Sequence, residues 1–486
     1  MNESRAIDRF ACTCSDWCYA FAMAQSLSDP PVAGQIITVL GTDLNHQGLG
    51  LARWQGWVVI VPQLLPGEEA QVQLLQRKKS QWFARHLKTL VAAPGARKPP
   101  CILAKDCGGC SLQHLEESIQ AEWKRSRLEQ TLKRIGGINI QSPAPINNDL
   151  EHLGYRNRAL IPLLRKEDQM RLGYYRRGSH RIVNLSRCPV LDPRIDALIK
   201  PLKQDLEGSG WPADADLHGE LGLRHLGLRV GVRTGELLIT LVSATAELNG
   251  MKDLAVEWMN RWPAVTGVTL NLQPRRSNTI LGAITHTLAG RDCISERFCN
   301  LQLLLGTTTF FQINTDRAEQ IVMVLRNWLL QRGDCKRLID AYCGIGTISL
   351  PVAAAGIGVV GLEINPASVQ QARQNAALNG LTDAKFEAGD VASLLSDYLP
   401  DHDALVVDPP RKGLASDVLD AILNCPPKRL AYLSCDSATL ARDLKRLVSD
   451  NGPYAIDRIQ PVDFFPQTTH LECLVLMERV NCEVQP

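Results

Sequence analysis

The sequence predicts an α/β protein that is built in three parts behind an N-terminal tail. A chain of 486 residues is too long for one hydrophobic core, so more than one domain is expected. Short strands separated by glycines fill one N-terminal stretch, and strands alternate with helices after Arg332. The expected bounds are 1–30 for the tail, 31–93 for a small β-barrel, 94–305 for a central α+β domain and 306–486 for a doubly wound domain.

The first predicted domain is a small barrel of five strands. Over residues 34–90, short alternating segments such as QIITVL and QWFARHLKTL are separated by glycine-containing turns. Strands of this length and spacing are typical of small barrels of the OB type. A proline- and glycine-rich stretch over 93–100 then predicts a linker.

The middle third of the chain mixes a helix with strands. A polar helix is expected over 116–135, and strands are expected around 156–164, 225–232 and 237–242. This pattern predicts an α+β domain but does not give the order of its strands.

The last part of the chain alternates strands with helices. RLIDAYCGIGTISL has the form of a strand, a glycine turn and the start of a helix, and GVVGLEIN, KFEAGD, ALVVDPP and RLAYLSCD supply further strands. This alternation predicts a parallel, doubly wound sheet, in which ligands bind beyond the carboxyl ends of the strands. The motifs of the last part fall at those ends.

The glycine turn that begins at Tyr342 predicts a cofactor site. Glycines let the backbone approach a ligand, and the start of the helix offers free amides. Glu363 ends the next strand, where a carboxylate can accept hydrogen bonds from a ribose, and Asp390 follows the third strand near the expected adenine. A dinucleotide fingerprint would carry a third glycine where Ser349 stands. S-adenosylmethionine therefore fits this site better than a nicotinamide cofactor.

Two strand ends predict methylation of a pyrimidine carbon. LVVDPPRKG places Asp408 at a strand end, and Arg411 stands where enzymes that methylate base nitrogens carry an aromatic residue. The next strand ends at Cys435, whose thiolate could add to carbon 6 of uracil and make carbon 5 nucleophilic. Glu472 is the candidate base for the carbon 5 proton. An ordinary core thiol is the alternative for Cys435, and its place one strand after DPP favours the nucleophile.

A cluster of cysteines predicts a metal site. Cys101, Cys107 and Cys110 lie around a Gly-Gly turn, and Cys188, which precedes a proline, is the natural fourth ligand. Both zinc and a [4Fe–4S] cluster accept four thiolates, and the lack of paired CxxC motifs favours iron–sulfur. No role is assigned to the remaining cysteines, which we expect in the tail, in the core or at incidental positions: Cys12, Cys14, Cys18, Cys293, Cys299, Cys335, Cys343, Cys425, Cys473 and Cys482.

With DPPRKG, SCD and the cysteine spacing, the chain resembles the uracil-5 RNA methyltransferases over about residues 34–480. It is most similar to the 23S ribosomal RNA type, which carries an N-terminal TRAM domain and a [4Fe–4S] cluster. The resemblance implies S-adenosylmethionine-dependent formation of 5-methyluridine, with Cys435 as nucleophile and Glu472 as base. It implies that Cys101, Cys107, Cys110 and Cys188 ligate the cluster, and that the cofactor is contacted by Gln312, Tyr342, Thr347, Glu363, Asp390 and Asp408.

The distribution of charge agrees with an RNA partner. The formal net charge is only +2, but residues 77–98 hold seven Lys/Arg and no acid, and residues 155–187 hold nine Lys/Arg against two acids. Such stretches can neutralise phosphates, although a solvated surface is the alternative for either one. No apolar run is long enough to span a membrane, and no signal peptide is evident. We expect a cytoplasmic monomer that acts on RNA and binds neither DNA nor a membrane.

Three other functions are considered. Transfer-RNA members of the family are expected to lack both the barrel and the cluster, which favours ribosomal RNA over tRNA as the substrate. A non-catalytic RNA-binding or ribosome-assembly factor would have lost Cys435 or Glu472, and both are present. A cytosine-5 methyltransferase would carry a proline–cysteine nucleophile and an ENV-type acid, but Ser434 precedes Cys435 and no ENV occurs.

Overall fold

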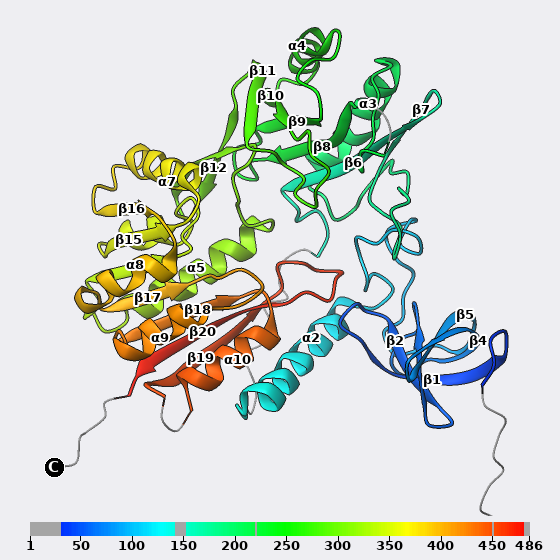
Figure 1. Ribbon diagram of the computed structural model, residues 1–486, viewed down its shortest axis with the longest axis horizontal. Coiled ribbons are helices and arrows are strands. Elements are labelled where there is room, and N and C mark those ends of the chain that lie inside the picture. The colour runs from blue at the N-terminus through cyan, green and yellow to red at the C-terminus, as the bar shows by residue number, and fades with distance from the viewer. Residues whose placement is uncertain (1–30, 141–151, 219–220, 450–451, 481–486) are drawn as a thin grey trace, which may run out of the picture. The chain divides into compact units, whose positions relative to one another are not determined.

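A computed structural model describes residues 31–140, 152–218, 221–449 and 452–480 (Figure 1). The chain divides into two compact units, one ending at Pro94 and the other starting at Gly95, with residues 46–48 grouped with the second. The predicted tail with Cys12, Cys14 and Cys18 lies outside the described residues, as does Cys482. Among the described residues, no helix is long and apolar enough to cross a membrane.

The first unit is a closed barrel of five strands, as predicted. The strands join in the order β1-β2-β3-β5-β4. Alternate side chains of the first strand, such as Ile37 and Val39, point into an apolar core. A side chain at Gly41 would meet the backbone oxygen of Leu65 at 2.1 Å, which explains the glycine in that strand. The strands are β1 Ile36–Leu44, β2 Gly50–Trp54, β3 Trp57–Val61, β4 Glu69–Lys78 and β5 Gln81–Val91.

The middle of the chain forms a mixed sheet of six strands, in the order β11-β10-β9-β8-β6-β7. Helices α3 (Pro193–Gly208) and α4 (Met251–Arg261) bury their apolar side chains in the core of this sheet. An α+β arrangement was predicted, and the strand order is new information. The strands are β6 Arg158–Lys166, β7 Gln169–Leu172, β8 Leu223–Val230, β9 Leu237–Ser243, β10 Val265–Leu272 and β11 Ile284–Gly290, followed by the separate pair β12 Cys293–Phe298 and β13 Leu301–Gly306.

The last part forms the predicted doubly wound sheet. Seven strands lie in the order β16-β15-β14-β17-β18-β20-β19, and the five that do not form the terminal hairpin are parallel. The strands are β14 Arg337–Ala341, β15 Gly358–Glu363, β16 Ala384–Ala388, β17 Ala404–Val407, β18 Arg429–Ser434, β19 Tyr454–Val462 and β20 Glu472–Arg479.

Helices cover both faces of this sheet. Apolar side chains of α5, α6 and α7 pack on one face and those of α8, α9 and α10 pack on the other, because alternate residues of each strand point to opposite faces. The helices are α5 Thr315–Leu330, α6 Ser349–Ala353, α7 Pro366–Leu378, α8 Val391–Tyr398, α9 Ser416–Asn424 and α10 Ser437–Leu447, with a 3₁₀ turn, η2, at Leu399–Asp401.

The polar helix predicted over 116–135 is α2 (Glu117–Thr131), which continues into a π-helical turn, η1 (Leu132–Gly136). Although it precedes the central sheet in sequence, its Leu128 and the adjoining Leu132 pack into the core of the doubly wound sheet beside α10. The ammonium of Lys124 on α2 is fully buried and lies 2.7 Å from the carboxylate of Asp463. A buried ion pair therefore joins two segments that are far apart in sequence.

Candidate active site

The topology of the doubly wound sheet brings the predicted site residues to one edge. The strand order reverses at β14, which lies between β15 and β17, and ligands bind at such a reversal beyond the carboxyl ends of the strands. β20 is antiparallel to β18, so its first residue lies at the same edge as the end of β18. In strand order, the residues at or just beyond this edge are Asp390, Glu363, Tyr342 with Thr347, Asp408, Cys435 and Glu472.

The glycine turn between β14 and α6 faces the carboxylate of Glu363. The backbone adopts positive φ at Tyr342, Gly344 and Gly346, which glycine permits but which is costly for tyrosine. The amide of Tyr342 donates to the Leu362 carbonyl at 2.8 Å, and the amide of Gly344 donates to Glu363 Oε2 at 3.1 Å. These bonds hold the turn and the carboxylate together, as a cofactor site between them requires.

Asp340 is a buried carboxyl at this turn that the sequence analysis missed. Burial raises its pKa to about 7, and its Oδ2 accepts a hydrogen bond from the hydroxyl of Ser349. Ser349 is the residue that replaces the third glycine of a dinucleotide fingerprint, and in the structure its hydroxyl serves as the donor to Asp340 Oδ2. The signal in the sequence was an aspartate inside an otherwise apolar strand, RLIDA.

Cys435, Glu472 and Gln312 line one cavity of about 490 Å³. The side-chain amide of Asn157, which precedes β6, donates to the Gln312 carbonyl at 2.8 Å and so fixes this segment. The other side chains that line the cavity come from separate segments, so the sequence analysis did not group them at one site. These side chains include Arg156, Tyr174, Phe310, Arg411, Phe465 and His470.

The charges in this cavity set the protonation of the candidate base and nucleophile. Burial raises the pKa of Glu472 to about 7, and Arg411 opposes that rise. Burial also raises the pKa of Cys435, and the carboxylates of Glu472 and Asp408 raise it further, while Arg411 lowers it. Burial and the charge of Glu472 raise the pKa of Asp408. A carboxyl that titrates near neutral pH is well matched to the work of a general base.

The raised pKa of Glu472 predicts a pH-dependent cost to stability. In the unfolded chain this carboxyl has its ordinary pKa of 4.5, so its folded form binds a proton more tightly. The protonated carboxyl therefore favours the folded chain, and this stability is fully present below pH 4.5. It is lost as the pH rises through about 7, because the buried carboxyl must then carry a charge. We expect Glu472→Gln to be more stable than the parent at pH 8 by roughly 3 kcal/mol and about equally stable at pH 4.5. Urea unfolding at both pH values measures the difference, and a difference that does not change with pH would contradict the burial of a charged carboxylate.

The four predicted metal-site cysteines line a second, smaller cavity. Cys101, Cys107, Cys110 and Cys188 surround about 160 Å³, with Cys188 buried and the others half-buried. Burial, together with repulsion between the thiols, raises the pKa of Cys110 to about 11 and that of Cys188 to about 12. Within the described ranges, no three or more His, Cys, Asp or Glu side chains converge as they would around a single metal ion.

The cysteine cavity and the cavity that holds Cys435 and Glu472 share part of their walls. Arg156 and Tyr174 line both of them. Arg156 lies just before β6 and Tyr174 lies just after β7, so both belong to the central part of the chain.

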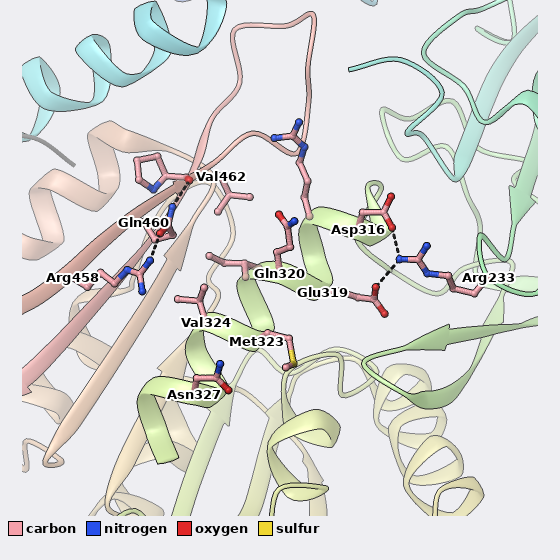
Figure 2. A pocket seen from close by; sticks show the side chains of 13 residues that line it. Arg233, Asp316, Glu319, Gln320, Met323, Val324, Asn327, Arg458, Gln460 and Val462 are labelled. Atoms are coloured by element: carbon pink, nitrogen blue, oxygen red, sulfur yellow. Dashed lines mark hydrogen bonds and ion pairs between the residues drawn. The ribbon is translucent and has the colours of Figure 1, made fainter. Parts of the chain in front are cut away.

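A larger cavity, of about 630 Å³, lies along α5 and β19, and none of the predicted site residues lines it (Figure 2). Arg233 reaches α5 there and forms ion pairs with Asp316 and Glu319. On β19, the guanidinium of Arg458 donates to Gln460 at 2.6 Å. The charged groups of this cavity are thus largely paired with one another, and size alone does not make it the site of the chemistry.

Comparison with known proteins identifies the family. The methyltransferase domain family matches residues 333–484, and the TRAM domain family matches residues 32–87. An uncharacterized RNA methyltransferase of Parasynechococcus marenigrum is 61% identical over 456 residues, which cover 93% of this chain and 98% of that protein. The chain belongs to this family of RNA methyltransferases. This chain is also 42% identical to an uncharacterized RNA methyltransferase of Synechocystis, over 92% of this chain and 96% of that protein.

The RNA methyltransferase also resembles an experimentally determined structure. The tRNA (uracil-54, C5)-methyltransferase of Pyrococcus abyssi, solved with S-adenosyl-L-homocysteine, matches with a TM-score of 0.74 and 27% identity, over 90% of this chain and 99% of that one. The uncovered tenth of 486 residues is about 49, fewer than the 93 residues of tail and barrel, so the match extends into the barrel. The expectation that transfer-RNA enzymes lack the barrel is therefore wrong for the P. abyssi enzyme.

Proposed function

We propose that this RNA methyltransferase methylates carbon 5 of a uridine in RNA through a covalent adduct between Cys435 and the uracil. The observation that carries the proposal is the shared cavity, which holds a half-buried thiol and a buried carboxyl whose pKa lies near neutrality. A non-catalytic RNA-binding factor would have no use for this pair. The P. abyssi enzyme supports the proposal, because it is a tRNA (uracil-54, C5)-methyltransferase.

The residues of the cavity supply each step of such a reaction. The thiolate of Cys435 adds to carbon 6, and the electrons of the 5,6 double bond move toward the oxygen on carbon 4. Bound S-adenosylmethionine would supply the methyl group to carbon 5, with its sulfur–methyl bond breaking and S-adenosylhomocysteine as the leaving group. The carboxylate of Glu472 then removes the proton from carbon 5, the double bond re-forms, and the thiolate leaves carbon 6. Arg411 favours the charged forms of both Cys435 and Glu472.

Aromatic side chains give the cavity a means of holding a base outside the RNA stack. Phe310 is 63% exposed although it lines the cavity, and an exposed phenyl ring there is suited to stack on a base. Phe465 and His470 lie edge to face, with ring centroids 5.8 Å apart, in the same cavity. Enzymes that modify a base must take it out of the stack, because its reacting atoms are otherwise covered.

We propose 23S ribosomal RNA as the substrate, on the resemblance to that branch of the family. The tRNA specificity of the P. abyssi enzyme makes tRNA the second candidate. Mapping of 5-methyluridine in ribosomal and transfer RNA from a deletion strain separates the two. We expect loss of the modification from 23S ribosomal RNA and its return when the parent gene is supplied. Loss from tRNA alone would assign the second substrate.

We propose that Cys101, Cys107, Cys110 and Cys188 hold a [4Fe–4S] cluster. Four thiols from two separate segments line one cavity. Both zinc and a [4Fe–4S] cluster accept four thiolates, and the lack of a second CxxC pair in this chain's cysteine spacing favours the cluster. Methyl transfer needs no electron donor, which assigns the cluster a structural or RNA-positioning role.

Protein purified without oxygen should therefore be brown, with about four iron and four sulfide per chain. Cys110→Ser should lose most of both, because it removes one of four ligands. Cys425→Ser is the matched control, since Cys425 lies in the doubly wound part, just after α9, and should keep the full content. Stoichiometric zinc without sulfide would overturn the iron–sulfur assignment.

A further inference from the structure

Two side chains of the loop that joins β19 to β20 line the proposed catalytic cavity, which also holds Cys435 and Glu472. Residues 463–471 leave the sheet after Val462, which pairs with Glu472, so the loop leads directly into the candidate base. Within the loop, Phe465 and His470 also line the cavity. The conformation of this one loop therefore sets the positions of the base and of two aromatic rings.

Gln467, in the middle of this loop, is held on all sides. Its side chain is completely buried, and its φ of 69° lies in the left-handed region, which is costly for a residue other than glycine. A buried polar residue in an unfavourable conformation stays there only when its surroundings compensate. Every polar group of Gln467 forms a hydrogen bond, and these bonds compensate for its burial and its backbone conformation.

The backbone of Gln467 binds the segment that follows the cysteine cluster. The amides of Ser111 and Leu112 donate to its carbonyl at 3.0 and 2.9 Å, and its own amide donates to Gln120 Oε1 at 3.1 Å. Ser111 comes directly after Cys110, so these bonds connect the loop to the wall of the cysteine cavity.

The side chain of Gln467 completes the connection. Its Oε1 accepts from Gln120 Nε2 at 3.0 Å and from the Arg97 guanidinium at 3.2 Å, and its Nε2 donates to Glu117 Oε1 at 2.8 Å. At the start of the loop, the buried pair of Lys124 and Asp463 adds a further tie to α2.

We propose that Gln467 is a positioning residue for the final step of the reaction. By holding the 463–471 loop against residues 97–120, it keeps Glu472 where the carboxylate can take the carbon 5 proton. The inference rests on the proposed function, because it assumes the covalent mechanism and the role of Glu472. General-base catalysis needs the base within hydrogen-bonding distance of the proton, and small displacements of a reacting group are costly.

The test uses the full-length protein, labelled S-adenosylmethionine and substrate RNA, and follows methyl transfer and product release separately. Gln467→Met keeps the size of the side chain but removes its hydrogen bonds. We expect release of methylated RNA to slow by at least about tenfold, while the first methyl transfer changes by less than about threefold. Methyl-labelled adduct should then accumulate on a denaturing gel.

A charge exchange provides a second test if Gln467→Met folds poorly. Gln467→Glu places the new carboxylate against the carboxylate of Glu117, and the repulsion between them should slow release. Adding Glu117→Gln restores a donor opposite the new carboxylate, and Arg97 can still donate to it, so the double variant should recover release to within about threefold of the parent. A residue that acts only through global stability would show no such recovery of one step.

Asn271→Leu is the matched control, because it removes a buried amide that bonds the Gly282 carbonyl, away from the loop. It should lower stability without changing the ratio of release to methyl transfer. Normal release by folded Gln467→Met, or equal adduct accumulation in Asn271→Leu, would overturn the inference while leaving the proposed function intact. If the parent itself forms no adduct, the proposed function fails and the inference fails with it.

Discussion

Cys435→Ala should lower turnover by at least about 10³-fold while binding of S-adenosylmethionine stays close to that of the parent. The reason is chemical: carbon 5 of uracil is too weak a nucleophile until a thiolate has added to carbon 6. Apart from Gln312, which lines the same cavity as Cys435, the cofactor contacts are predicted at the ends of other strands, from β14 to β17, so removing the thiol should not disturb them. RNA that contains 5-fluorouridine should form a stable adduct with the parent and none with the variant, as measured on a denaturing gel.

Cys335→Ala is a suitable control for this experiment, because Cys335 is a buried thiol that lies before β14, at the opposite end of the strand from the glycine turn. It should form the adduct at the parent's rate. An adduct that persists in Cys435→Ala and disappears in another cysteine variant would remove Cys435 from the mechanism.

Glu472→Gln should allow one methyl transfer and then stop with RNA attached to the enzyme. Glutamine keeps the shape of the side chain but cannot take a proton at neutral pH. The carbon 5 proton must leave before Cys435 can be eliminated, so the adduct should carry the methyl label and persist. We expect release to slow by roughly 10²–10⁴-fold, the usual contribution of a general base.

The pH dependence of release provides a second measurement for the same residue. In the parent, the release rate should rise with pH through about 7, as the fraction of Glu472 carboxylate increases. Normal release by Glu472→Gln would mean that a water or another group removes the proton. A variant that binds cofactor but forms no adduct would instead place Glu472 in the step before thiolate attack.

Local sequence patterns predicted the elements whose structure depends on near neighbours. The glycine turn after β14 and the place of Cys435 after β18 follow from short motifs, because a parallel strand, its turn and its helix are contiguous in sequence. The strand order of the central sheet could not be predicted in this way, since pairings such as β6 with β8 join segments separated by more than 50 residues. The structure had to supply them.

Long-range polar contacts were beyond the sequence analysis for the same reason. Nothing near Lys124 indicates that its charge is buried against Asp463, 339 residues later. Likewise, nothing in the sequence around Gln467 sets it apart from an ordinary loop residue. Its bonds to residues 97–120 are visible only in the structure. The substrate expectation was limited differently: it relied on a supposed absence of the barrel in transfer-RNA enzymes, which the P. abyssi structure contradicts.

The wall that Arg156 and Tyr174 form between two cavities has an evolutionary consequence. A lineage that lost the four cysteines would leave a space of about 160 Å³ directly behind the pocket for the base. Empty apolar space in a protein interior is costly, so larger side chains should appear at the positions that line it, among them Leu103, Leu185 and Val190. Loss of the cysteines and enlargement at these positions should therefore occur together among relatives, in pairs of changes rather than singly.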